Sequence, residues 1–276
     1  MTQPPHTLQN RTVQDSKQPD PTAPKKRQHP VIAIDGPAGA GKSTLAAHLA
    51  RRFGCLNLET GAMYRALALK AIENDYAFDD EPPLMDLASR TRITLEPQLE
   101  GNRVLLDSVD VSRRIREPDV TSAASKISIH PHLRAWMVQQ QRALGEAGGV
   151  VMEGRDIGTA VFPDAEVKIF LDAAPEVRGN RRYRQATPES TADNDRKAST
   201  RQMPDPLTAE QQHLAEEAVI RELKERDYRD RHRAESPLQP AADAVILDST
   251  TMTLQEVLAR AEEIVRSHLH VKPRDI

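Results

Sequence analysis

The stretch Val31-Ile32-Ala33-Ile34-Asp35-Gly36-Pro37-Ala38-Gly39-Ala40-Gly41-Lys42-Ser43-Thr44 decides the fold of this chain. Its first five residues form a short apolar run rich in β-branched side chains, which predicts a buried strand. Residues 36–41 contain three glycines and predict a tight turn. From residue 42 to 53 the apolar side chains of Leu45, Leu49 and Phe53 recur at helical spacing. The stretch therefore predicts a strand, a glycine-rich turn and a helix in direct succession.

The turn matches the phosphate-binding pattern G-x-x-x-x-G-K-[ST]. In such a loop the backbone N–H groups surround phosphate oxygens, and the N-terminus of the following helix adds a favourable dipole. Lys42 is expected to bridge the β- and γ-phosphates, and the Ser43 hydroxyl to bind Mg²⁺. The chain is therefore expected to bind ATP or GTP. The residues expected to hold the nucleotide are Gly36, Pro37, Ala38, Gly39, Ala40, Gly41, Lys42, Ser43 and Thr44.

Further apolar runs at residues 150–152, 167–171 and 244–247 predict more buried strands, with helical patterns between them. This alternation is typical of an α/β fold, a parallel sheet with helices on both faces. A closing amphipathic helix is expected over residues 254–268. Its apolar face would carry Leu254, Val257, Leu258, Ala261, Ile264 and Val265.

Three segments depart from this alternation. Residues 1–29 are rich in proline and polar side chains and are expected to be disordered, with Lys25-Lys26-Arg27 a solvated basic run. Residues 78–147 predict an inserted subdomain with a hairpin that turns at Gly101-Asn102 and is followed by helices. Residues 185–212 are polar and lack periodicity, so we expect a mobile loop there.

Composition excludes several other classes of protein. The 276 residues carry 38 Lys and Arg against 41 Asp and Glu, which argues against a general nucleic-acid binder. No apolar run approaches the roughly 18 residues of a membrane span. The single cysteine, Cys55, leaves no internal disulfide and fits a reducing cytoplasm. We therefore expect a cytoplasmic protein whose partners are small molecules, not membranes or nucleic acids.

Three motifs identify the class of acceptor: LETGAMYRAL at residues 58–67, VMEGRDIGT at 151–159 and KERDYRDRHR at 224–233. Together with the glycine-rich loop they closely resemble the bacterial cytidylate kinases, and the resemblance runs from about residue 31 to 268. It implies an enzyme with a P-loop fold that transfers the γ-phosphate of ATP to CMP or dCMP with Mg²⁺. Residues 30–276 would form the kinase domain, with a core at 31–77 and 148–270, a monophosphate-binding insert at 78–147 and a lid at 178–225. It also implies a monomer.

The resemblance also implies roles for individual residues. Arg65 and Arg155 would clamp the phosphate of CMP, and Thr60 is also expected to bind the substrate. The cytosine ring would be read by Arg134, Asp156 and Arg233, and the sugar held by Ser125, Arg226 and Asp230. The residues expected to act on the transferring phosphoryl group are Lys42, Arg155, Arg178, Arg181, Arg182 and Arg229. Asp35 and Glu153 would join Ser43 at the metal.

Arginine suits these tasks because its planar guanidinium makes paired contacts with phosphate, and because phosphoryl transfer is catalysed chiefly by alignment and positive charge. A carboxylate beside guanidinium groups would distinguish cytosine from uracil. The chain departs from the family pattern at Glu59 and Glu153, where relatives usually have aspartate.

Three alternatives stay open from the sequence. The first is a kinase for another small acceptor such as UMP, AMP or shikimate. The second is a GTP-binding switch, although the guanine-reading sequence Asn-Lys-x-Asp does not occur in this chain. The third is a nucleotide-binding module that has lost its kinase activity, against which the intact Lys42, Ser43, Arg65 and Arg155 argue. As a bare pattern, the charges of residues 221–233 also fit a solvated helix face.

Overall fold

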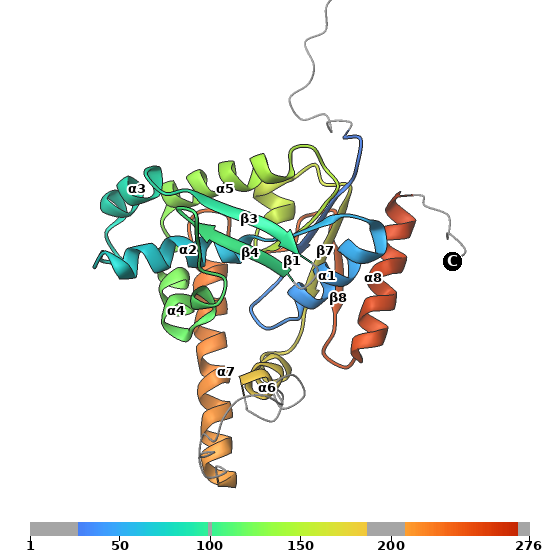
Figure 1. Ribbon diagram of the computed structural model, residues 1–276. Coiled ribbons are helices and arrows are strands. Elements are labelled where there is room, and N and C mark those ends of the chain that lie inside the picture. The colour runs from blue at the N-terminus through green and yellow to red at the C-terminus, as the bar shows by residue number, and fades with distance from the viewer. Residues whose placement is uncertain (1–26, 99–100, 187–207, 270–276) are drawn as a thin grey trace, which may run out of the picture.

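The computed structural model describes residues 27–98, 101–186 and 208–269 (Figure 1). Its centre is a five-stranded sheet in the order β2-β6-β1-β7-β8, and every neighbouring pair is parallel. This confirms the predicted α/β fold. The strands are β1 (Val31–Asp35), β2 (Leu56–Glu59), β6 (Val150–Gly154), β7 (Val167–Asp172) and β8 (Val245–Asp248).

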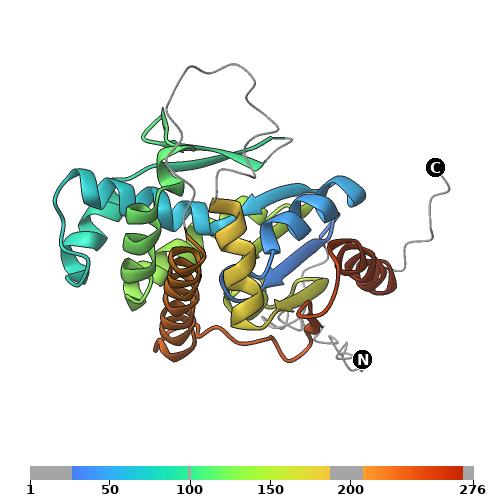
Figure 2. The same ribbon diagram turned by 90° about the horizontal axis from the view of Figure 1, so that it is seen from below.

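The sheet is covered by helices on both faces, as predicted (Figure 2). Alternate side chains of β1 enter different cores, because successive residues of a strand point to opposite faces. Ile32 and Ile34 pack with α1 (Lys42–Phe53) and α8 (Leu254–Leu269). Val31 and Ala33 belong to the other core, to which α2 (Thr60–Glu73) and α5 (Pro131–Gly145) contribute. One central strand thus joins the two halves of the hydrophobic core.

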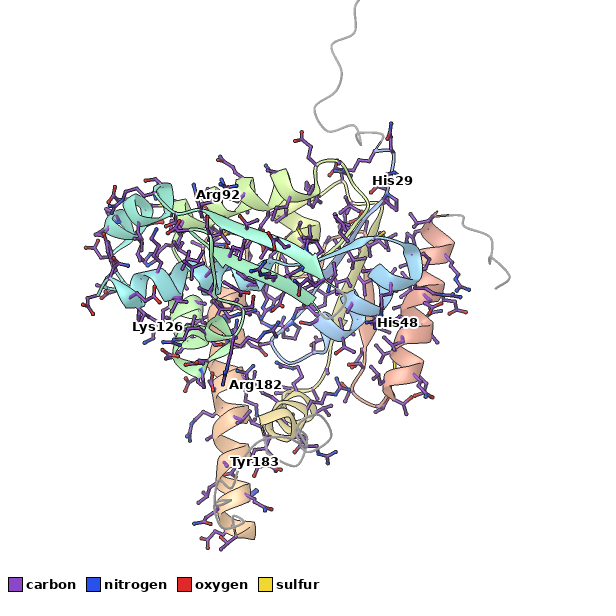
Figure 3. The ribbon with its side chains drawn as sticks, in the orientation of Figure 1. His29, His48, Arg92, Lys126, Arg182 and Tyr183 are labelled. Atoms are coloured by element: carbon purple, nitrogen blue, oxygen red, sulfur yellow. The ribbon has the colours of Figure 1, made fainter. Side chains whose placement is uncertain are left out.

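Helix α8 buries most of its predicted apolar face against α1. Val257, Ala261, Ile264 and Val265 are buried. His48 of α1 lies at the same contact, with its Nε2 2.8 Å from a carboxylate oxygen of Glu262 (Figure 3). The prediction was wrong for Leu254, which is 59% exposed because it begins the helix at the edge of the open cavity described below.

A second group of strands and helices is formed by the part of the chain between α2 and β6 in the sequence. An antiparallel sheet of β3 (Ile93–Gln98), β4 (Gly101–Leu106) and β5 (Val109–Asp110) packs with helical segments around it (Figure 1). These segments are α3 (Glu81–Ser89), η1 (Arg114–Arg116), α4 (Pro118–Ile127) and α5. The predicted hairpin is confirmed as β3 and β4, but its turn was wrongly placed at Gly101-Asn102, since these residues belong to β4 and pair with Gln98 and Pro97 of β3. The side chain of Asn102 reaches across to β2, which keeps this residue inside the sheet.

A short π-helical segment, η2 (Ile157–Val161), lies between β6 and β7, and two helices follow β7. They are α6 (Pro175–Ala186) and the long α7 (Ala209–His232), whose far end projects from the body of the molecule (Figure 1). The Ile220 side chain of α7 packs directly on the backbone of α6 at Gly179, where a Cβ would lie 2.3 Å from Ile220 Cγ1. Residues 187–207 of the predicted loop lie outside the described part of the chain. On either side of them the loop prediction was wrong, since the chain is helical, and Thr208 begins α7 with a capping box.

The start of the ordered chain also differs from expectation. Arg27, predicted to be solvated, is buried in ion pairs with Asp164 (2.8 Å) and Glu166 (3.3 Å). Glu166 also accepts a 2.7 Å hydrogen bond from the backbone N–H of Val31. These carboxylates, which precede β7, hold the segment that enters β1, and residues 1–26 lie outside the described part of the chain. Of the helices that the structure describes, none combines the length and apolar character needed to cross a bilayer.

Candidate active site

The glycine-rich loop joins the end of β1 to the start of α1. Gly36 has a φ of +149°, and a Cβ there would lie 2.0 Å from the carbonyl oxygen of Leu171, so that only glycine fits against β7. Gly41, also at positive φ, is the N-cap of α1. The Lys42 ammonium donates a 2.7 Å hydrogen bond to the carbonyl of Pro37 across the loop. The loop therefore wraps the N-terminus of α1, as an anion-binding loop requires.

A buried arginine supports the loop from behind. The guanidinium of Arg178, on α6, donates 2.8 Å hydrogen bonds to the carbonyls of Ala38 and Ala173. It also lies 2.5 Å from a carboxylate oxygen of Asp227 on α7. Only 2% of Arg178 is exposed. Arg178 thus joins the loop to both α6 and α7.

One continuous cavity of about 980 Å³ opens from the loop. It runs from Ala38–Leu45 to residues of the insert and of α7. The predicted site residues outside the loop that line it are Thr60, Arg65, Arg134, Glu153, Arg155, Asp156, Arg181, Arg182, Arg226, Asp230 and Arg233. Residues more than 170 positions apart in the sequence thereby share one chamber. The predicted residues that do not line it are Asp35, Gly36, Pro37, Ser125, Arg178 and Arg229.

The middle of the cavity is crowded with positive charge. Burial, together with the neighbouring Arg155, lowers the pKa of Lys42 to about 7. Burial and the same Arg155 lower the pKa of Arg226 to about 10. Arg155 is itself held by Asp230, with its Nε 3.0 Å from the carboxylate, whereas Arg65 pairs with Glu59. An anionic ligand placed here would relieve the mutual repulsion of these cations.

The far end of the cavity combines a carboxylate with two guanidinium groups. Arg134 pairs with Asp156 and donates a 3.0 Å hydrogen bond to the carbonyl of Ser128. Arg233 donates to the carbonyl of Ser236 at 2.7 Å. Within the described residues, Nη2 of Arg233 and Nε of Arg134 are buried polar atoms without a hydrogen-bond partner. Such atoms are ready to bind a polar ligand, because leaving them unpaired is costly.

Of the three residues predicted to hold a metal, Ser43 and Glu153 lie together, whereas Asp35 is engaged elsewhere. The Ser43 hydroxyl hydrogen-bonds to Glu153, whose Oε1 is buried without a partner among the described residues. Burial and the nearby Glu59 raise the pKa of Glu153 to about 7. Asp35 has both carboxylate oxygens occupied, since they accept hydrogen bonds from the backbone N–H groups of Ile157 (2.8 Å) and Gly158 (2.7 Å).

The remaining predicted residues tie the helices together. Arg229 of α7 donates to the Ser125 hydroxyl of α4, at 3.2 Å from Nη2 and 3.3 Å from Nε. Arg181 donates to the carbonyl (2.9 Å) and the hydroxyl (3.1 Å) of Ser249. Arg182, next to it on α6, lines the cavity (Figure 3).

Sequence reasoning missed two residues of this cavity, and also Asn102, which holds the backbone of Glu59 from outside it. Tyr64 and Arg116 line the cavity, and burial raises the pKa of Tyr64 to about 12. Tyr64 directly precedes Arg65, a residue predicted to bind the substrate, and the chain has only four tyrosines. This position was the one feature of the sequence that could have indicated a role for Tyr64. Arg116 and Asn102 gave no such signal, because the insert brings them to β2 only in the folded chain.

A phosphate-binding loop after the central strand of a parallel sheet, facing a second chamber rich in arginine, defines a P-loop kinase with a separate acceptor site. The model of the cytidylate kinase family matches residues 32–205 and 191–267. The chain belongs to the cytidylate kinase family.

Individual relatives agree with the family match. A cytidylate kinase from Solibacter usitatus is 44% identical over 90% of this chain and 97% of its own length. Those from Pelotomaculum thermopropionicum and Pasteurella multocida are 46% and 39% identical, over 83% and 88% of this chain and 92% and 97% of theirs. A solved shikimate kinase from Acinetobacter baumannii aligns over 90% of this chain and 97% of its own at 16% identity, with a TM-score of only 0.36.

Proposed function

We propose that this chain transfers the γ-phosphate of ATP to CMP or dCMP, giving ADP and CDP or dCDP. The family supports the reaction, and one observation in the structure supports the assignment most directly. The phosphate-binding loop and the Arg134–Asp156 pair line the same cavity of about 980 Å³. A donor nucleotide on the loop and an acceptor nucleotide in the arginine-rich chamber would therefore bind in the same cavity, where phosphate can pass directly from one to the other.

The donor triphosphate would lie on the N-terminus of α1. The positive end of the helix dipole and the loop amides would hold its oxygens, with Lys42 beside the γ-phosphate. The oxygens of Ser43 and Glu153 fit Mg²⁺, which takes few protein ligands and completes its shell with water and phosphate. The described residues contain no cluster of three or more His, Cys, Asp or Glu side chains that could hold a metal. Bound Mg²⁺ would neutralise charge on the phosphates.

The acceptor phosphate would lie between Arg65 and Arg155, and Arg226, which was expected to hold the sugar, lies near both. Arg65 pairs with Glu59 through Nη2, and its Nε has no hydrogen-bond partner among the described residues, so the guanidinium keeps donors for a phosphate. The carboxylate of Glu59 reaches Arg65 six residues further along the chain. Thr60, whose hydroxyl donates 2.7 Å to the carbonyl of Glu153, connects this acceptor region to the metal region.

The acceptor base would lie against Asp156, Arg134 and Arg233. Cytosine presents an amino donor beside ring-nitrogen and carbonyl acceptors, which complements a carboxylate flanked by guanidinium groups. Uracil would place a carbonyl against the carboxylate of Asp156, so the site would reject it.

Four predicted residues receive positioning roles in this proposal. Asp35 would anchor the turn after β6, because both of its oxygens are engaged there, instead of binding the metal. Arg178 would hold the phosphate-binding loop instead of touching the phosphoryl group. Arg229 and Ser125 would fasten α7 to the insert. The arginines left to surround the phosphoryl group are Arg155, Arg181 and Arg182, with Lys42.

We also propose that the chain works as a monomer in the cytoplasm. Within one chain, the phosphate-binding loop and the proposed acceptor residues already line a shared cavity. A single cysteine suits a reducing compartment.

The proposal is tested by measuring ADP release from ATP·Mg²⁺ with CMP, dCMP, UMP, AMP, GMP or no acceptor. We expect turnover with CMP and dCMP and little with the others. The variant Lys42→Ala serves as the control for contaminating kinases and should lose at least about a hundredfold, the effect of removing one preorganised charge. Acceptor-independent hydrolysis, or turnover with UMP or AMP instead, would contradict the proposed function.

A further inference from the structure

The outer edge of the central sheet is completed by a side chain from the insert. β2 is the edge strand of the sheet, with β6 on one side only. The backbone N–H of Leu56 donates toward β6, to the carbonyl of Gly149 (2.8 Å). Because backbone groups alternate along a strand, those of Asn57 and Glu59 face the open edge. Edge groups of this kind are unpaired unless another segment supplies partners.

Asn102 of β4 supplies those partners. Its Oδ1 accepts a 2.8 Å hydrogen bond from the N–H of Glu59, and its Nδ2 donates a 2.7 Å hydrogen bond to the carbonyl of Asn57. In a parallel sheet one residue bonds its neighbour strand at positions i−1 and i+1 in this same pattern. The amide of Asn102 thus takes the place of a peptide group opposite Leu58. It is 7% exposed.

The two bonded groups lie where the proposed acceptor site begins. Glu59 is the N-cap of α2 and has no side-chain cap of its own. The next residue is Thr60, and Arg65 follows on the same helix. A change in the position of Asn102 therefore moves the corner between β2 and α2, which carries these acceptor residues.

We propose that Asn102 is a positioning residue for the acceptor site, through which the insert sets the geometry of the β2–α2 corner. The inference rests on the proposed function for its kinetic consequence. The side-chain hydrogen bonds of Asn102 go to Asn57 and Glu59 of β2 and not to the phosphate-binding loop. The donor nucleotide should therefore be held as before when Asn102 is changed.

The test compares Asn102→Ala, Asn102→Asp and the control Ser112→Ala. The control removes a hydroxyl that accepts a 2.8 Å hydrogen bond from Val104 N–H of β4, and Ser112 hydrogen-bonds to Val104 and Asp110, neither of them in β2. We expect Asn102→Ala to raise KM for CMP about tenfold, because a displacement near 1 Å of positioning groups costs up to about a hundredfold. KM for ATP should change less than about twofold, and Ser112→Ala should change neither. Equal changes in both KM values, or the same split in Ser112→Ala, would overturn the proposal.

Hydrogen exchange of the Glu59 amide provides a readout that does not depend on the acceptor. The amide should exchange slowly in the wild type and in Asn102→Asp, which keeps the acceptor oxygen, and rapidly in Asn102→Ala. Unchanged protection in Asn102→Ala would overturn the proposal even if CMP is not the substrate. Failure of the wild type to use CMP would instead contradict only the proposed function. If Asn102→Ala does not fold, Asn102→Asp should still raise KM for CMP, because it loses the donor to Asn57.

Discussion

Replacing Arg178 with methionine separates a positioning role from a direct contact with the phosphoryl group. The substitution removes three hydrogen bonds of a guanidinium that is 2% exposed, to Ala38, Ala173 and Asp227. It leaves the Asp227 carboxylate buried without its cation, and Oδ1 of Asp227 already has no partner among the described residues. Breaking a buried ion pair in this way costs about 3 to 5 kcal/mol. We therefore expect Arg178→Met to lower the free energy of unfolding by that amount.

The assay is urea denaturation in parallel with steady-state ADP release. Lys224→Met is a matched control, because Lys224 and Glu176 form an exposed ion pair of 2.9 Å between the same two helices. That pair should contribute less than about 1 kcal/mol. The double variant Arg178→Met with Asp227→Leu should recover part of the loss, since no buried charge is left unpaired. A large fall in kcat with an unchanged free energy of unfolding would refute the positioning role and favour direct contact with the phosphoryl group.

Two further predictions concern the acceptor base and the buried carboxylate near Ser43. Asp156→Ala removes the partner of the buried Arg134, so kcat/KM for CMP should fall roughly a hundredfold or more. ATP binding, measured by calorimetry, should stay nearly constant. Equal losses for both ligands would point to a general folding defect. Burial raises the folded-state pKa of Glu153 from 4.5 to about 7, so without nucleotide and metal its ionisation opposes folding increasingly as the pH rises through this window. Glu153→Gln should therefore gain stability relative to the wild type between pH 4.5 and 7, on the order of 3 kcal/mol, in urea denaturation at several pH values. A difference between the two proteins that does not change with pH would contradict this assignment.

Local pattern was sufficient for the main elements. The run of residues 31–35 and the helical spacing of residues 42–53 predicted β1 and α1, because a buried strand and an amphipathic helix leave signatures within a few residues. The resemblance to the cytidylate kinases extended this to the acceptor chamber, and most residues that it implied do line one cavity. Predictions failed where a long-range contact overrides local preference. Asn102 resembles a turn residue, but its bonds to β2 hold it within a strand, and Arg27 appears solvated until Asp164 and Glu166 are brought beside it.

The sequence by itself determined that a phosphate-binding loop follows a central strand, because the loop depends on glycines and a lysine at fixed spacing along one segment. It also determined the family, because several motifs spread along the chain occur together. Only the tertiary structure decided which arginines face the cavity and which support it from behind. Arg178 and Arg181 are three residues apart on one helix, yet the first is buried behind the loop and the second lines the chamber. That difference arises from what packs against each face of α6, and such packing partners come from segments remote in the sequence.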